Sequence, residues 1–73
     1  MSTQTVTINV AGMTCGHCVR SVQEELRALP GVTGVDIELV SGGESQVRIS
    51  SIRLLPDDDV REAIAEAGYT VVG

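Results

Sequence analysis

The sequence lacks lysine, phenylalanine and tryptophan, and it contains one tyrosine, one histidine and two cysteines. Without large aromatic rings, the core has to consist of Val, Ile, Leu and Ala side chains. A chain of 73 residues buries only about 60% of its unfolded surface when it folds. We therefore expect a single domain over residues 1–73, with an aliphatic core and no deep substrate cavity.

Positive charge is also scarce, because five arginines stand against ten acidic residues and the formal net charge is −5. Such a surface repels phosphate backbones and anionic lipids, so we expect no nucleic-acid partner. The opening segment Met1–Thr5 has no basic residue, and no long apolar run follows it. This predicts a cytoplasmic protein without an export signal or direct membrane insertion. In a reducing cytosol, a cysteine pair favours metal binding or catalysis over a structural disulfide.

The first half of the chain shows strand and helix patterns in turn. Apolar and polar residues alternate from Thr5 to Val10, which predicts a half-buried strand. An apolar stripe at helical spacing then predicts a helix that ends at Pro30. A second alternation, Val32 to Val40, predicts another strand, with Leu39 on its inward face.

The second half repeats this order. The glycine-containing segment 41–44 predicts a hairpin turn, after which residues 46–49 return as an antiparallel strand. We expect Asp57–Asp59 to cap a second helix and to oppose its positive N-terminal dipole. The buried stripe of this helix should consist of Val60, Ala63, Ile64 and Ala67. Gly68 is placed to end that helix, and residues 69–72 form a short last strand.

Two strand-helix-strand halves interleave into an α+β, ferredoxin-like β-α-β-β-α-β sandwich, an antiparallel four-stranded sheet with two helices on one face. Right-handed crossovers place the first and third strands in the middle. The loop after the first strand and the loop after the second helix then lie at the same end of the sheet. Tyr69 should therefore lie near Cys15 and Cys18.

The two cysteines are spaced C-x-x-C where the first strand gives way to the first helix. We expect Cys15 in the loop and Cys18 in the first helical turn, where the helix N-terminus favours the thiolate. Soft sulfur ligands favour Cu(I), whereas a structural zinc site needs four ligands and only His17 could join the thiols. Thioredoxin-like folds also use C-x-x-C, but they need more helices and a cis-proline facing the cysteines, and neither Pro30 nor Pro56 is placed for that role.

We also expect particular roles for the residues near the two cysteines. Met13 should pack beneath the loop as core, with thioether ligation of copper as the alternative. Thr14 should face outward and cap the helix. His17 should be exposed, with a role as an occasional third ligand left open. Tyr69 is either a strand-edge aromatic or a shield that keeps water and extra ligands from the ion.

Two stretches of the sequence resemble a known family. The run Gly12-Met13-Thr14-Cys15-Gly16-His17-Cys18 resembles the G-M-T-C-x-x-C signature of heavy-metal-associated domains, and Glu66-Ala67-Gly68-Tyr69 resembles the family's E-A-G-Y close. The resemblance covers nearly the whole chain. It implies a ferredoxin-like domain that holds Cu(I) between its two cysteines and passes it to a partner with the same motif. Thr14, where zinc and cadmium domains often have an acidic residue, favours copper, and His17 and Tyr69 resemble bacterial copper chaperones.

The resulting prediction is a cytoplasmic copper chaperone, not an enzyme, that delivers Cu(I) to the N-terminal metal-binding domain of a copper-exporting P-type ATPase. We expect a monomer when metal-free, which copper can bridge into a homodimer. The alternatives are a metal-binding domain excised from such an ATPase, a mercury-binding carrier and a thiol redox protein.

Overall fold

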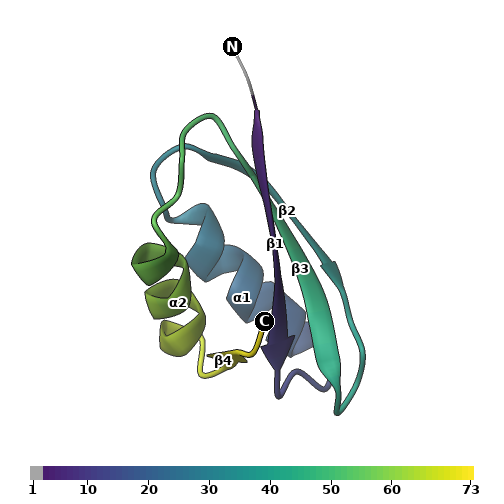
Figure 1. Cartoon of the computed structure of the whole chain (residues 1–73). Coiled ribbons are helices and arrows are strands. Elements are labelled where there is room, and N and C mark those ends of the chain that lie inside the picture. The colour runs from purple at the N-terminus through teal and green to yellow at the C-terminus, as the bar shows by residue number, and fades with distance from the viewer. Residues whose placement is uncertain (1–2) are drawn as a thin grey trace.

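The computed structural model describes residues 3–73 (Figure 1). The elements are β1 (Gln4–Ala11), α1 (Gly16–Arg27), β2 (Val32–Glu38), β3 (Glu44–Ser51), α2 (Asp57–Glu66) and β4 (Thr70–Val71). This order confirms the predicted ferredoxin-like α+β fold. Residues 1 and 2 of the opening segment, on which part of the export-signal prediction rests, lie outside the described residues. Neither helix in residues 3–73 is long and apolar enough to cross a membrane.

The four strands form one antiparallel sheet in the order β2-β3-β1-β4, so β1 and β3 are central, as predicted. Both helices cover the same face of this sheet (Figure 1). Ala11, at the end of β1, pairs with Glu44 at the start of β3 and with Thr70 at the start of β4. The β1–α1 loop, the β2–β3 turn and the α2–β4 loop therefore meet at one end of the sheet.

The core between the sheet and the helices is aliphatic, as the missing aromatic residues predicted. Each fully buried side chain of this kind contributes about 1.5–3 kcal/mol through removal of apolar surface from water. The two helices contribute the central residues of their predicted stripes, while Val19, Leu29 and Ala67 at the margins are only half-buried. The buried set is Ile8, Val10, Met13, Val22, Leu26, Val35, Val47, Ile49, Leu55, Val60, Ala63 and Ile64.

Gly68 ends α2 as predicted, and it does so in a motif that directs the next residue. Its φ is +93°, a left-handed conformation that favours glycine. The N–H of Gly68 donates to the carbonyl oxygen of Ala65 at 2.9 Å, and the N–H of Tyr69 donates to that of Ile64 at 3.1 Å. These two bonds form a Schellman motif, which satisfies the last carbonyls of the helix. The chain consequently reverses and carries Tyr69 toward the start of α1.

Several expectations about this fold are wrong. The third strand spans Glu44–Ser51 rather than 46–49, and the last strand spans Thr70–Val71 rather than 69–72, so Tyr69 precedes β4. Strand β2 ends at Glu38, so Leu39 belongs to the following turn and its side chain is 37% exposed rather than inward-facing. The N-cap of α2 is Pro56, and no side chain caps the helix. Asp57–Asp59 already lie within the first helical turn, so even Asp57 is one position too late to adopt the extended backbone that an N-cap needs. Their contribution is the interaction of negative charge with the helix dipole.

Candidate metal centre

A short loop between β1 and α1, residues 12–15, carries the first thiol; we call it the thiol loop. Gly12 has a φ of +97°, which lets the chain turn away from the strand. Met13 is fully buried in the core, whereas Thr14 and Cys15 are exposed. The loop is thus anchored from beneath by Met13, which takes the core position that we predicted for it, while the first thiol stays accessible to solvent.

The two thiols converge at the start of α1. Cys15 is exposed at the N-cap position, and Cys18 is half-buried in the first turn. Both are free, and their sulfur atoms are 3.8 Å apart. With metal–sulfur bonds of about 2.3 Å, the length found for zinc, this separation corresponds to a sulfur–metal–sulfur angle of about 111°. Two sulfurs can therefore hold one ion while a side of that ion remains open.

Thr14 does not cap the helix, so that expectation is wrong. Helix α1 begins at Gly16, which makes Cys15 the N-cap, and its side chain makes no capping bond. The carbonyl oxygen of Cys15 accepts hydrogen bonds from the N–H groups of Cys18 at 3.1 Å and Val19 at 3.3 Å. Because Thr14 lies one residue too early to cap, its hydroxyl lies instead 3.8 Å from the Cys18 sulfur.

The surroundings of Cys18 favour its thiolate. Hydrogen bonding from the backbone of Thr14 is the largest cause, followed by the Tyr69 hydroxyl and the backbone of Cys15, and together they lower the pKa of the Cys18 thiol from 9.0 to about 6. The pKa of Tyr69 is raised, first because its proton is shared with Cys18, and also because of desolvation and the nearby negative sulfurs. At neutral pH, Cys18 is therefore largely ionised and ready to bind a cation.

Tyr69 lies beside Cys18, as the topology predicted, although it comes from the far end of the chain. Its ring also lies against Gly12, where an added Cβ atom would be 3.4 Å from the Tyr69 Cδ1 atom. His17 is exposed, as expected, and with Gly16 and Arg20 it lines a shallow surface hollow. Within residues 3–73, no three His, Cys, Asp or Glu side chains gather closely enough to hold a metal ion together. The structure thus does not bring His17 to the thiols as a third ligand.

We expect replacement of Tyr69 by Phe to shift the reactivity of Cys18 to higher pH. The substitution removes a hydrogen-bond donor to the thiolate, so the pKa of Cys18 should rise above about 6. Because the pKa of Cys18 is lower in the folded chain, its ionisation also stabilises the fold. This contribution is complete above pH 9.0, the ordinary pKa of the thiol, and is lost as the pH falls through about 6. The measurement is the iodoacetamide alkylation rate from pH 5 to 9, with peptide mapping to isolate Cys18. An unchanged profile in Tyr69→Phe would contradict this role of the hydroxyl.

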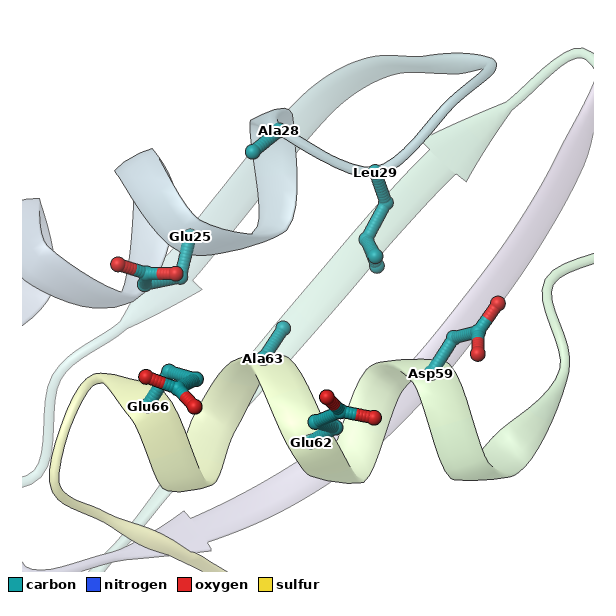
Figure 2. Close-up of a pocket in the computed structure, with 7 residues that line it drawn as sticks. All are labelled: Glu25, Ala28, Leu29, Asp59, Glu62, Ala63 and Glu66. Atoms are coloured by element: carbon teal, nitrogen blue, oxygen red, sulfur yellow. The ribbon is translucent and has the colours of Figure 1, made fainter.

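A separate groove of about 320 Å³ lies between the two helices (Figure 2). Four carboxylates surround it, and apolar side chains from α2 and from the segment just after α1 also line it (Figure 2). No cysteine lines this groove, so the hollow between the helices and the thiol pair are distinct features. Its lining residues are Glu25, Ala28, Leu29, Asp59, Glu62, Ala63 and Glu66.

Contacts from the β2–β3 turn were not expected from the sequence. The hydroxyl of Ser41 donates to the carbonyl oxygen of Thr14 at 3.1 Å, and the N–H of Gly42 donates to that of Met13 at 3.2 Å. These contacts join segments 27 and 29 residues apart, so no local sequence pattern indicates them. The only signal was topological, since the turn and the thiol loop lie at the same end of the sheet.

Known proteins resemble this chain over most of its length. Over 71 aligned residues it is 35% identical to "Copper chaperone CopZ" from Staphylococcus aureus (strain JH9), with 89% of this chain and 93% of that relative covered. A solved structure called "CopZ metallochaperone" superposes with a TM-score of 0.82 and 34% identity, covering 94% of this chain and 100% of the other.

Two further solved structures that resemble this chain are domains whose names refer to copper. The yeast copper transporter domain Ccc2a, solved in apo and Cu(I)-loaded states, has a TM-score of 0.76 and 31% identity, with 94% of both chains covered. A copper-binding domain from HMA7, a P-type ATPase, has a TM-score of 0.77 and 25% identity, with 94% of this chain and 93% of the other covered. The family described as the heavy-metal-associated domain matches residues 7–70. The chain therefore belongs to the heavy-metal-associated domain family.

Proposed function

We propose that this protein is a copper chaperone that holds Cu(I) between Cys15 and Cys18 and passes it to a partner domain. The observation that carries the proposal is the pair of free thiols, 3.8 Å apart in an exposed loop at a helix N-terminus. Similarity to CopZ supports a chaperone, and similarity to a domain solved in its Cu(I)-loaded state supports that ion.

The donor set suits Cu(I) better than zinc. Thiolates are soft ligands, and ligand softness selects Cu(I) among the metals that a cell offers. A structural zinc site takes four ligands, and in residues 3–73 the thiols have no His, Asp or Glu side chain gathered with them. The positive end of the α1 dipole and the backbone amides facing Cys18 stabilise the negative charge that two thiolates confer on a monovalent ion.

Transfer follows from the exposure of the site and its unfilled coordination. A thiolate of the partner attacks the copper ion, a three-sulfur intermediate forms, and the bond to one of the donor cysteines then breaks. The second thiolate of the partner displaces the remaining donor cysteine in the same way. Copper stays Cu(I) throughout, and each donor sulfur leaves as a thiolate. Three sulfurs arranged evenly around an ion with bonds of about 2.3 Å lie about 4.0 Å apart. The two sulfurs here, at 3.8 Å, are already close to that arrangement.

The partner that we propose is the N-terminal metal-binding domain of a copper-exporting P-type ATPase. A P-type ATPase carries a copper-binding domain of this fold, so donor and acceptor can present matching thiol pairs to each other. The same likeness favours the second candidate, namely that this chain is itself a metal-binding domain of such a pump. In either case we propose a cytoplasmic carrier without enzymatic activity, which is monomeric when metal-free.

Cu(I) titration and transfer under anaerobic conditions test this proposal. We expect one Cu(I) per chain at low loading, and gel filtration should reveal a copper-bridged homodimer as loading rises. Mixing the loaded protein with the metal-binding domain of a copper ATPase, followed by separation on an ion-exchange column, should move copper to that domain. Metal analysis of protein from copper-supplemented cells distinguishes copper from mercury or zinc. Copper that stays on the donor, or disulfide reductase activity against insulin, would contradict a carrier role.

A further inference from the structure

The β2–β3 turn, residues 39–43, holds two consecutive carbonyl groups of the thiol loop. Its Gly42 N–H donates to the carbonyl oxygen of Met13 at 3.2 Å, and its Ser41 hydroxyl donates to the carbonyl oxygen of Thr14 at 3.1 Å. In Figure 1 the turn and the loop lie side by side at the end of the sheet where β1 terminates. The orientation of these two peptide groups is therefore set by a segment distant in the sequence.

The same two peptide groups carry the N–H groups of Thr14 and Cys15. In a trans peptide the C=O and N–H bonds point in opposite directions, and residues 3–73 contain no cis peptide bond. When the carbonyl oxygen of one of these peptide groups points toward the turn, the N–H of the same peptide group therefore points away from the turn. The backbones of Thr14 and Cys15 are among the hydrogen-bonding groups that lower the pKa of the Cys18 thiol, together with the hydroxyls of Tyr69 and Thr14.

The turn is held firmly enough to act as a support. Ser45 is fully buried at the start of β3, and its hydroxyl oxygen accepts the N–H of Val40 at 2.9 Å and donates to the Val40 carbonyl at 3.3 Å. The N–H of Gly43 donates to the same carbonyl at 3.0 Å. The two Ser45 bonds tie the turn to the central strand β3, and the Gly43 bond closes the turn on itself. A displacement of the thiol loop therefore breaks its hydrogen bonds to a turn that is fastened to the sheet.

We propose that Ser41 is a positioning residue for the metal site: its hydroxyl orients the Thr14–Cys15 peptide so that the Cys15 N–H faces the sulfur of Cys18. Ser41 itself is exposed and lies outside the C-x-x-C motif. A metal-bound thiolate pair carries negative charge, so an N–H held toward it lowers the energy of the loaded state. This last step rests on the proposed Cu(I) function, whereas the orientation of the peptide does not.

The test compares Ser41→Ala with Ser41→Thr, which keeps the hydroxyl. A typical hydrogen bond corresponds to a change of about three- to tenfold in an equilibrium constant. In metal-free protein labelled with ¹⁵N, Ser41→Ala should shift the Cys15 amide resonance and speed its exchange with water by about three- to tenfold. Cu(I) affinity, measured against a chelator, should fall by about the same factor. Ser41→Thr should restore both values.

The matched control is Thr33→Val at the opposite end of the sheet. The Thr33 hydroxyl donates to the Ser50 carbonyl at 3.3 Å, so this variant also loses a bond between a hydroxyl and a backbone carbonyl. An unchanged Cys15 amide in Ser41→Ala overturns the proposal, whether or not copper binds. Equal losses of affinity in Ser41→Ala and Thr33→Val overturn it too, because they indicate a general loss of stability. If the unsubstituted protein binds no Cu(I), the proposed function fails, and the amide measurement still decides the role of Ser41.

Discussion

Replacing Cys18 with serine should weaken Cu(I) binding by more than about 100-fold, since even outer groups around metal sites cost 10–100-fold when they are removed. Serine keeps the size of the side chain but replaces a soft thiolate with a neutral hydroxyl. It also removes the group that the Thr14 and Cys15 backbones and the Tyr69 hydroxyl stabilise as an anion. A single remaining thiolate cannot hold the ion between two sulfurs. Cys15→Ser should show a loss of similar size.

Competition against a colorimetric Cu(I) chelator, with reductant present, measures this loss. His17→Ala is the matched control, because it changes a residue between the two cysteines whose exposed side chain is not gathered with the thiols. It should leave the affinity within about threefold, and circular dichroism should show the same fold in all variants. Full-strength binding by either serine variant would refute the two-thiol site. A loss in His17→Ala as large as in Cys18→Ser would instead make the imidazole a ligand.

The sequence predicted the features of this structure that depend on the regular spacing of apolar residues and on the order of the strands in the sheet. The alternation in β1 and the stripes of α1 and α2 identified most of the core, because burial on one face imposes a regular spacing. The expected strand order correctly predicted that Tyr69 lies near Cys18, because antiparallel pairing determines which loops share an end of the sheet. Gly68 was recognisable because few other residues adopt its positive φ.

The errors occurred where a boundary shifted by one or two residues. Thr14 and Asp57 have side chains that often cap helices, but α1 begins after Cys15 and α2 begins after Pro56. Only the residue directly before the helix has the extended backbone that allows its side chain to cap the helix. The amino-acid composition does not show which residue that is. Leu39 fits the alternation of β2, yet the strand ends one residue before it, and its side chain therefore lies in the turn.

The contacts of Ser41 could not be predicted for a different reason. Serine in a glycine-containing turn is ordinary, and nothing in segment 41–44 indicates a partner 27 residues earlier. Ser45 is a related case. The alternation of β3 places it on the inward face with Val47 and Ile49, but it does not show that Val40 across the turn satisfies the buried hydroxyl. Such long-range polar contacts depend on the final geometry of the loops rather than on a repeating pattern.

Met13→Ala should destabilise the fold by about 2–5 kcal/mol, the usual cost of truncating a fully buried methionine. A domain of 73 residues has a total stability of roughly 4–11 kcal/mol, so a substantial part of it would be lost. With a urea dependence of about 1–3 kcal/mol per molar, the denaturation midpoint should fall by about 1 M or more. Urea titration of the metal-free protein, followed by circular dichroism, measures the change.

Met13→Leu separates the two roles that the sequence left open for this residue. Leucine fills a similar volume, so the cost should stay below about 1.5 kcal/mol if Met13 acts through packing. The Met13 carbonyl still accepts the N–H of Gly42 in this variant, because that bond is made by the backbone. Cu(I) affinity should therefore equal that of the unsubstituted protein. A tenfold loss of affinity in a stably folded Met13→Leu would mean that the thioether turns out of the core to contact copper. The complete burial of the side chain beneath the thiol loop argues against that movement, because the cavity left behind would cost as much as the truncation to alanine.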